Sequence, residues 1–295
     1  MKGELAALGA AAAWACGGAI IKPVTERFDP FAVNFLRAGT GCLFFLALTL
    51  PFGVIPRINP SIFDSLLYLV GSGIAGVAIG TSLYLKSLGI TEVSRVHAVS
   101  FSSWILITAV IAWSLLAEPF TGRTISGAFL VVLGVALLVG AFERRKANPR
   151  SQALRGGMLA LASGACWAGG TILLKFALCD LDPLEANVVR LPVIALSLLP
   201  AVLLRGRSSD LREMLRGPGI FPRVGAAGVL DQAVGALLFF IAVRYTGAAR
   251  ATVLSSLSPL FVLPFSALLL REKPGRTIVL GVVLSVAGAC LISAS

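Results

Sequence analysis

The sequence is poor in charge. Asp, Glu, Lys and Arg make up 13% of its 295 residues, whereas hydrophobic residues make up 57%. An average soluble protein has about 25% charged and roughly 45–50% apolar residues. The longest polar stretches are 142–155 and 205–218, each far shorter than a soluble domain. The composition therefore argues against a soluble catalytic domain and predicts an integral membrane protein.

Histidine and cysteine are too few, or too far apart, for the common metal and disulfide sites. His97 is the only histidine. The five cysteines are Cys16, Cys42, Cys166, Cys179 and Cys290. An odd, dispersed set supports neither a disulfide framework nor a zinc site. Paired-histidine, Walker and G-x-S-x-G motifs are missing as well, so we expect neither an enzyme nor a bound cofactor.

Acidic residues are also scarce, which leaves a net charge of +11. Such a charge can indicate nucleic-acid binding. Here, however, the basic residues are spread over short connections between apolar runs, as they are in membrane proteins. The expected partners are a lipid bilayer and a small-molecule substrate, and not a nucleic acid.

A membrane-spanning helix needs about 20 mainly apolar residues. Apolar runs separated by turn formers and charges predict ten such helices, near 3–22, 31–51, 62–85, 93–117, 124–142, 154–178, 184–204, 220–244, 247–270 and 275–294. The first run is not expected to be a cleaved signal peptide, because 154–178 repeats it within the chain.

Seven residues near the beginning of the chain recur after 153 positions. Trp14, Gly17, Lys22, Asp29, Pro30, Asn34 and Arg37 correspond to Trp167, Gly170, Lys175, Asp182, Pro183, Asn187 and Arg190. The chain is therefore predicted to be a duplication, with halves 1–142 and 154–295 joined by 143–153. Five helices in each half make the second half begin on the opposite membrane face. The expected fold is thus all-α, with ten transmembrane helices in two inverted five-helix repeats.

The repeated unit resembles the EamA-type repeat of the drug/metabolite transporter superfamily. The resemblance lies in the tryptophan-bearing helix with a terminal Lys, the Asp-Pro pair and the Arg inside the next helix. In the second half it extends through Arg244-Tyr245-Thr246-Gly247 to Ser258-Pro259 and Glu272. It implies ten helices in two inverted halves and the transport of small metabolites such as amino acids, often by export.

Asp231 is an acid deep inside a predicted span, next to Gln232. An ionisable group at the bilayer centre costs between about 3 and more than 10 kcal/mol, so it is a functional candidate. Asp231 could bind a proton or a substrate amine, or an arginine of a neighbouring helix could balance its charge. Counting from Gly89 and Gly247 makes Gly73 its counterpart in the first half.

Arg37 and Arg190 each follow an asparagine by three residues, so Asn34 and Asn187 share a helix face with them. A guanidinium group suits a carboxylate or a phosphate. It could instead reach the membrane interface or bind loop carbonyls. Because both halves keep the pair while a substrate is usually asymmetric, we favour the structural role.

Aromatic residues near the helix centres are cavity candidates. Trp14 and Trp167 lie beside glycines that allow another helix to approach closely, although packing alone accounts for them almost as well. Tyr84, Phe239 and Phe240 are further candidates, and lipid-facing positions account for them equally well. Lys22 and Lys175 end their helices and are expected to be interface anchors.

Polar residues also mark the fourth and ninth predicted helices. His97 carries the one type of side chain that ordinarily changes charge between pH 5 and 8, so it is a candidate proton switch or a loop-bonding residue. Ser256 and Ser258 precede Pro259 and Pro264, and the prolines would free backbone carbonyls along a transport path. Glu118 and Glu272 end these two helices, where a loop ion pair is expected.

The orientation is contested. Six Lys and Arg residues fall on the side of the termini and 17 on the other side, so the positive-inside rule would place both termini outside. The family resemblance implies cytoplasmic termini, and we follow it. The glycines 73, 76, 80, 127 and 134 suit internal packing or dimerisation, so a monomer and a homodimer are equally compatible with the sequence.

Together these observations predict a multi-pass plasma-membrane protein that acts as a secondary transporter. It would export a small polar or amphipathic metabolite by alternating access around a midplane cavity, with coupling to protons through Asp231 and His97 as a further hypothesis. The alternative is import or exchange of an anionic metabolite. An intramembrane enzyme or a receptor is disfavoured, because the sequence has a single deep acid.

Overall fold

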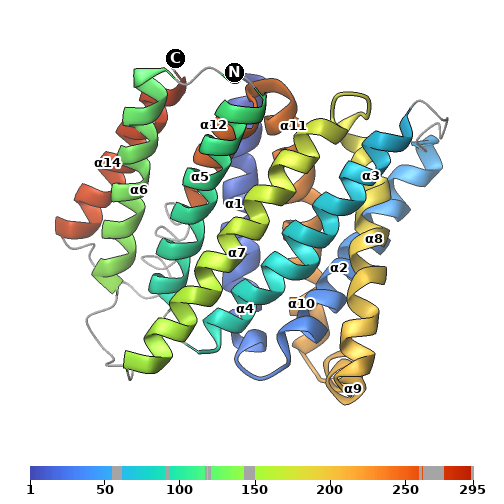
Figure 1. The fold of residues 1–295 in the computed structure, drawn as a ribbon. Coiled ribbons are helices and arrows are strands. Elements are labelled where there is room, and N and C mark those ends of the chain that lie inside the picture. Colours follow the sequence, from blue (N-terminus) through green and yellow to red (C-terminus); the bar gives the residue numbers. More distant parts are fainter. Residues whose placement is uncertain are drawn as a thin grey trace.

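The structure is a computed structural model, and it describes residues 1–54, 62–90, 93–116, 118, 121–142, 150–258, 261 and 276–293. Every regular element in these residues is a helix (Figure 1). The helices are α1 (Lys2–Thr25), α2 (Pro30–Thr49), η1 (Leu50–Phe52), α3 (Phe63–Ser72), η3 (Gly73–Thr81), α4 (Ser82–Leu88), α5 (Val93–Leu116), α6 (Gly122–Phe142), α7 (Arg150–Ala177), α8 (Pro183–Leu204), α9 (Ser208–Arg216), α10 (Ile220–Gly228), η4 (Val229–Gly235), α11 (Ala236–Thr246), α12 (Ala248–Ser255) and α14 (Arg276–Ser293).

Seven helical segments of the described chain are long and apolar enough to cross a membrane. They are Lys2–Ile21, Pro30–Phe52, Phe63–Leu88, Val99–Leu116, Leu154–Ala177, Pro183–Leu204 and Ile220–Thr246. The shorter apolar segment Gly122–Gly134 lies in α6. The protein is therefore an all-helical, multi-pass membrane protein. Much of the predicted ninth span lies outside the described residues, and the count of ten remains a prediction.

The repeated Asp-Pro pairs begin α2 and α8. Asp29 Oδ1 accepts hydrogen bonds from the backbone N–H groups of Phe31 and Ala32, at 3.0 and 3.4 Å. Asp182 caps α8 in the same way and forms a capping box with Glu185. The prolines follow at the first helical position, where a missing N–H costs nothing. This part of the repeat therefore sets where two helices begin.

Two of the long segments contain a π-helical stretch near the middle. η3 lies between α3 and α4, and η4 lies between α10 and α11, so each segment is a continuous helix with a wider turn inside it. π-Helical turns are rare and are frequently found at functional sites. Asp231 and Gln232 both lie in η4.

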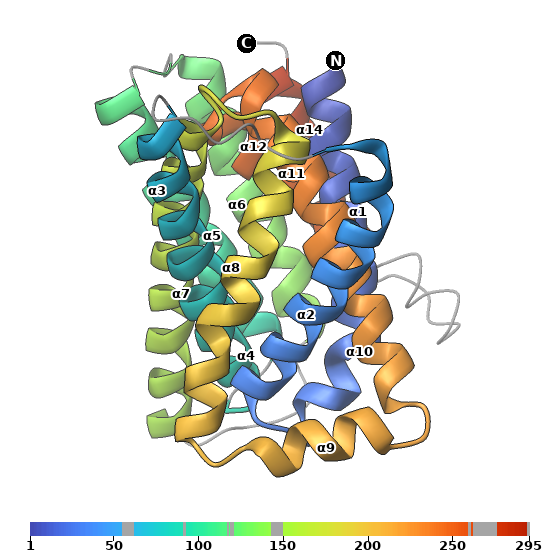
Figure 2. The same ribbon diagram turned by 90° about the vertical axis from the view of Figure 1, so that its right-hand side faces the viewer.

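Each tryptophan-bearing helix of the repeat packs against a segment from the other half of the sequence. α1 contacts α10, η4 and α11, whereas α7 contacts α3, η3 and α4. α2 packs on α8, and α6 packs on α14 (Figures 1 and 2). In the last pair, Gly134 lies against Gly281 and Ser285. The glycines of α6 thus serve packing inside the chain.

α9 was not expected from the sequence, where 205–218 was only a polar stretch. It lies across the end of the bundle opposite to the start of α1 (Figure 2). Its Met214 is fully buried, Glu213 forms an ion pair with Arg27, and Arg207 lies 3.9 Å from Asp29. One apolar anchor and several exposed charges make α9 an amphipathic helix.

Candidate functional site

Arg37 of α2 and Asp231 of η4 form an ion pair inside the bundle. Each residue is 6% exposed. A buried charge is stable only when a partner of opposite charge compensates it. The structure therefore matches the interpretation in which an arginine of a neighbouring helix balances Asp231. Arg37 does not extend to the surface of the bundle. The alternative in which its guanidinium reaches the membrane interface is therefore wrong for this residue.

The ion pair is closely enclosed and only partly satisfied. Asp231 Oδ1 and Arg37 Nε have no hydrogen-bond partner among the residues that the structure describes. Gly17 of α1 lies directly against the carboxylate, and a Cβ atom there would collide with it. Gly17 thus makes room for the acid, which explains one of the repeated glycines.

Arg190, the counterpart of Arg37 in the second half, has a different environment. It is 7% exposed, and its Nη2 donates to the backbone oxygen of Ser72 at 3.3 Å. Its guanidinium lies over the Phe240 ring, 5.1 Å from the centroid, and its Nε has no hydrogen-bond partner in the described ranges. The ion pairs in the described part of the chain do not include Arg190. Like Arg37, it does not reach the surface.

The glycine contacts identify the true counterpart of Asp231. Gly17 lies against Asp231, and its repeat equivalent Gly170 lies against Gly76. The sequence-based choice of Gly73 was therefore wrong by one helical turn. The reason is that α11 has 11 residues and α4 has 7, so counting back from Gly247 and Gly89 does not reach equivalent positions. Arg190 faces Gly76, whereas Arg37 faces Asp231 at the equivalent position.

Six aromatic side chains from five helices meet near the middle of the molecule, and we call them the aromatic cluster. They are Trp14 (α1), Tyr84 (α4), Phe101 and Trp104 (α5), Trp167 (α7) and Phe239 (α11). Neighbouring ring centroids lie 5.2 to 6.0 Å apart, within the range of favourable aromatic contacts. Trp14, Tyr84 and Trp167 are only half-buried although they lie inside the bundle.

Each indole N–H in the aromatic cluster has a hydrogen-bond partner. Trp14 donates to the backbone oxygen of Asp231 at 3.2 Å. Trp104 donates to Thr171 Oγ1 at 3.0 Å, and Trp167 donates to Thr81 Oγ1 at 3.3 Å. These bonds fix the orientation of the rings, and the bond from Trp14 connects the cluster to the ion pair.

Trp104, Phe101 and Thr171 were not identified from the sequence as site residues. A signal was present, because Trp104 lies in the centre of α5 one residue after Ser103. Trp104 has no equivalent tryptophan in the second half of the sequence, so the repeat does not single it out. Phe239, one of the candidate cavity aromatics, lies in the aromatic cluster, whereas its neighbour Phe240 contacts Arg190.

Asn34 and Asn187 hold the π-helical stretches in place. Asn34 Nδ2 donates to the backbone oxygen of Val77 in η3 at 2.9 Å and to Ser82 Oγ at 3.1 Å. Asn187 Nδ2 donates to the backbone oxygen of Ala233 in η4 at 3.2 Å. Both asparagines are fully buried. Gln232 is buried with its Cβ close to Gly41 of α2.

The remaining candidates lie apart from the aromatic cluster or outside the described residues. Ser256 Oγ donates to its own helix at Val253, Ser258 is buried, and Lys175 Nζ donates to the backbone oxygen of Val243 at 3.3 Å. The side chains of Lys22 and His97 lie outside the described part of the chain, as do Pro259, Pro264 and Glu272.

Glu118 does not behave as the sequence suggested. Its two carboxylate oxygens accept hydrogen bonds from the backbone N–H groups of Ala248 and Ala249, at 2.7 and 3.0 Å. These N–H groups are at the beginning of α12, where helix donors lack partners within the helix. The carboxylate also suits the positive end of the helix dipole. Glu118 thus caps a helix of the other half.

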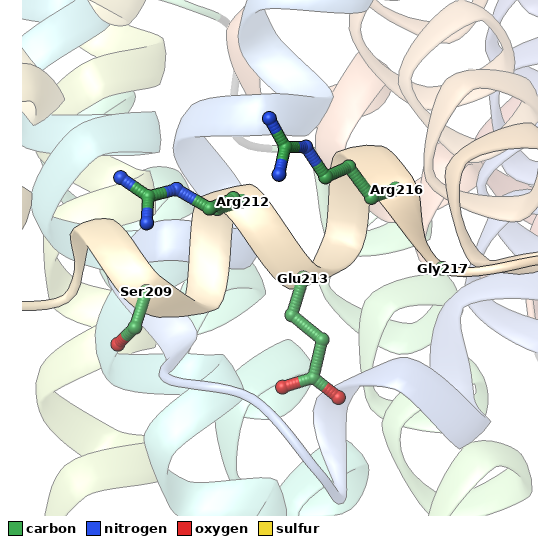
Figure 3. A pocket seen from close by; sticks show the side chains of 5 residues that line it. All are labelled: Ser209, Arg212, Glu213, Arg216 and Gly217. Atoms are coloured by element: carbon green, nitrogen blue, oxygen red, sulfur yellow. The ribbon is translucent and has the colours of Figure 1, made fainter.

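A shallow pocket lies on α9 and is lined by Ser209, Arg212, Glu213, Arg216 and Gly217. In Figure 3 the two arginines point to one side of the helix and Glu213 to the other. Glu213 is already paired with Arg27. This pocket shares no residue with the aromatic cluster, and we do not assign the site to it. The described residues contain no group of three or more potential metal ligands.

Comparison with protein families gives a match in each half of the sequence. Residues 1–140 and 154–294 both match the model described as the EamA-like transporter family. The two matched segments leave only the connection between them and the last residue uncovered.

Similar proteins are named as transporters of unassigned function. An uncharacterized transporter of Archaeoglobus fulgidus is 25% identical over 94% of this chain and 93% of its own length. One from Clostridium kluyveri is 22% identical over 89% and 83%. One from Methanothermobacter thermautotrophicus is 26% identical, and the match spans 58% of that protein. A crystal structure with 19% identity covers 99% of this chain with a TM-score of 0.76, which shows a shared fold.

Proposed function

The chain belongs to the EamA-like transporter family, within the drug/metabolite transporter superfamily, and on that basis we propose that it is a secondary carrier that exports a small amphipathic metabolite, such as an amino acid. The membrane in question would be the plasma membrane. The proposal adds the mechanism, the kind of substrate and the direction to a family membership that specifies only transport.

The observation that carries the proposal is the aromatic cluster. Its members come from both sequence halves, and its three tryptophans lie near the centres of their helices. Three of the six rings are half-buried inside the bundle. Rings held by hydrogen bonds form a rigid apolar surface that suits the apolar part of a substrate. Binding at this depth is typical of carriers built from inverted repeats.

Several contacts support alternating access between two inverted halves. The tryptophan-bearing helix of each half packs on the π-containing segment of the other, through Gly17 on Asp231 and through Gly170 on Gly76. Glu118 of the first half caps α12 of the second. Rocking of one half against the other would change these contacts while the aromatic cluster stays between them.

Purified protein in proteoliposomes tests the function. Thermal stabilisation is first screened over amino acids, amines and organic acids, and radiolabelled counterflow is then measured for each stabilising compound. We expect at least one amphipathic compound to stabilise the protein and to exchange. Trp104→Phe should weaken both responses, whereas Trp113→Phe, on an exposed face of α5, should weaken neither. If compounds stabilise the protein but none of them undergoes counterflow, the protein is not a carrier of those compounds and the proposal is contradicted.

Proton coupling is a further part of the proposal. Protonation of Asp231 would remove the charge that holds Arg37, so a proton could loosen the contact between α2 and η4. Asp231→Asn mimics the protonated state. We expect this variant to exchange substrate without responding to a pH gradient. Full pH-driven transport by Asp231→Asn would rule out coupling at this residue and leave His97 as the candidate.

Import or exchange of an anionic metabolite is the second candidate. It is favoured by Arg190, a buried cation whose contacts in the described part of the chain do not include a carboxylate. Right-side-out and inside-out vesicles supplied with the same labelled substrate on the outside, under the same energising gradient, decide the direction, since an exporter accumulates substrate only in the inside-out preparation.

A further inference from the structure

Arg37 and Arg190 occupy equivalent positions in the repeat but differ in availability. The Arg37 guanidinium is committed to Asp231. Within the part of the chain that the structure describes, Arg190 donates to a single backbone carbonyl, contacts one aromatic ring and leaves Nε without an acceptor. Arg190 lies opposite Gly76, and the residue equivalent to Gly76 in the other half is the acid Asp231. The second half therefore contains a buried cation without a counter-ion among the described residues.

Such a cation is costly in a membrane protein. A guanidinium deep in a bundle loses its hydration, and a carbonyl and a ring recover only part of that energy. A planar cation with a free N–H is a strong site for a carboxylate, which can accept two parallel hydrogen bonds. The missing counter-ion is thus best supplied by a ligand.

Arg190 is also connected to the aromatic cluster. Its guanidinium lies over Phe240, and the neighbouring residue Phe239 belongs to the cluster. Gly76, which it faces, precedes Gly80 by one turn, and Gly80 lies against Trp167. A ligand with its apolar body against the aromatic cluster would extend its polar end toward Arg190.

We propose that Arg190 binds the carboxylate of the transported substrate, and that Arg37 does not take part because Asp231 neutralises it. This inference rests on the proposed carrier function and narrows it to substrates that combine a carboxylate with an apolar body. Gly76 is then a specificity-determining position, because an acid there would neutralise Arg190 as Asp231 neutralises Arg37.

The test uses three ligands of equal size and different charge, namely 3-phenylpropionate, 3-phenylpropanamide and 3-phenylpropylamine. Their affinities are measured by calorimetry with the full-length protein in nanodiscs. We expect the acid to bind about 10- to 100-fold more tightly than the amide, the ratio given by one charged hydrogen-bonded pair. Arg190→Gln should remove that ratio, whereas Arg205→Gln should keep it, since Arg205 is exposed over Phe31 at the end of α8.

Gly76→Asp provides a second variant in case Arg190→Gln does not fold. A Cβ at this position would lie 3.5 Å from Arg190 Nη2 and 3.6 Å from Gly170 Cα, which are ordinary contacts. We expect Gly76→Asp to bind the acid no better than the amide and to keep its affinity for the amide. A preference for the acid that survives in either variant, or equal binding of acid and amide by the natural protein, overturns the assignment.

The carboxylate site and the carrier function can fail separately, and the measurements distinguish the two failures. If counterflow occurs with amines or neutral compounds but the three phenyl ligands do not separate by charge, the protein is a carrier and Arg190 is not its carboxylate site. If the acid binds through Arg190 but no compound undergoes counterflow, the site exists and the transport mechanism is wrong.

Discussion

The indole N–H of Trp14 donates to the backbone oxygen of Asp231, and this hydrogen bond joins the aromatic cluster to the residue that carries the buried ion pair. Trp14 contacts Trp104 and Phe239, while the Asp231 side chain pairs with Arg37. A change in the charge of Asp231 therefore acts on a residue whose backbone supports the aromatic cluster. This arrangement places the ionisable group and the proposed substrate surface in one connected unit.

The ion pair should show a large coupling energy in a double-mutant cycle. Breaking a buried pair by Arg37→Gln should cost about 3–5 kcal/mol, because Asp231 is left charged and unpaired. The double variant Arg37→Gln with Asp231→Asn should recover more than half of the lost stability. Unfolding free energies measured by steric trapping in bicelles give these values.

The exposed pair of Arg27 and Glu213 is the matched control for that cycle. Its side chains are 63% and 50% exposed. Water and salt screen such a pair, so the same cycle should give a coupling energy below about 1 kcal/mol. Equal coupling energies for the two pairs would contradict the structure's account of the buried one.

Gly170 and Gly169 provide a comparison between neighbouring residues of one helix. A Cβ at Gly170 would lie 2.8 Å from the Cα of Gly76, whereas a Cβ at Gly169 meets nothing within 4 Å. Gly170→Ala should force α7 away from η3 and abolish transport. Gly169→Ala should be tolerated or raise stability by up to ~1 kcal/mol, because Ala is the better helix former. Melting temperature and counterflow separate the two, and similar results for both variants would mean that the close approach is unimportant.

Tryptophan fluorescence should report ligand binding from three of the four tryptophans. Trp14, Trp104 and Trp167 belong to the aromatic cluster, and Trp113 is 59% exposed on the outside of α5. Trp113→Phe should leave the ligand-induced change in emission intact. It should remove the part of the emission that quenchers attached to lipids reduce. Loss of the ligand response in Trp113→Phe would place the ligand outside the aromatic cluster.

Removal of the Glu118 carboxylate should loosen the beginning of α12. Glu118→Ala leaves the N–H groups of Ala248 and Ala249 without their acceptors, at a cost of about 0.5–2 kcal/mol for a lost helix cap. Hydrogen exchange should accelerate in the peptide that contains these two residues and should stay unchanged in α8. Glu118→Asp, which keeps the charge on a shorter side chain, should give an intermediate rate.

The class of protein and its family could be predicted from the sequence because they depend on local signals. Low charge and long apolar runs indicated the membrane, and the repeated Asp-Pro pairs indicated where α2 and α8 begin. These features need no knowledge of tertiary contacts. Trp14 and Trp167 are likewise recognisable without tertiary contacts, because they are one of the repeated pairs.

The pairing of residues could not be predicted in the same way. Arg37 and Asp231 were both recognised as unusual, but they are separated by 194 positions, and their contact depends on how α2 crosses η4. Trp104 was missed because it has no copy in the other half. Counting from the loop glycines predicts Gly73 instead of Gly76, because the helices between these glycines and the π-helical stretches differ in length.

The π-helical stretches have a consequence for the register of the helices that follow them. An α-helix turns by about 100° per residue, and a π-helical stretch turns by somewhat less because each of its turns holds more residues. One residue more or less in η3 or η4 therefore rotates everything after it by most of a quarter turn. Tyr84 follows η3 and Phe239 follows η4, and both rings face the aromatic cluster. The number of residues in each wide turn therefore determines which face of α4 and of α11 is directed inward. A single deletion at the beginning of η3, before Gly80 and Thr81, would turn Tyr84 away from Trp167 without removing any residue that touches either ring.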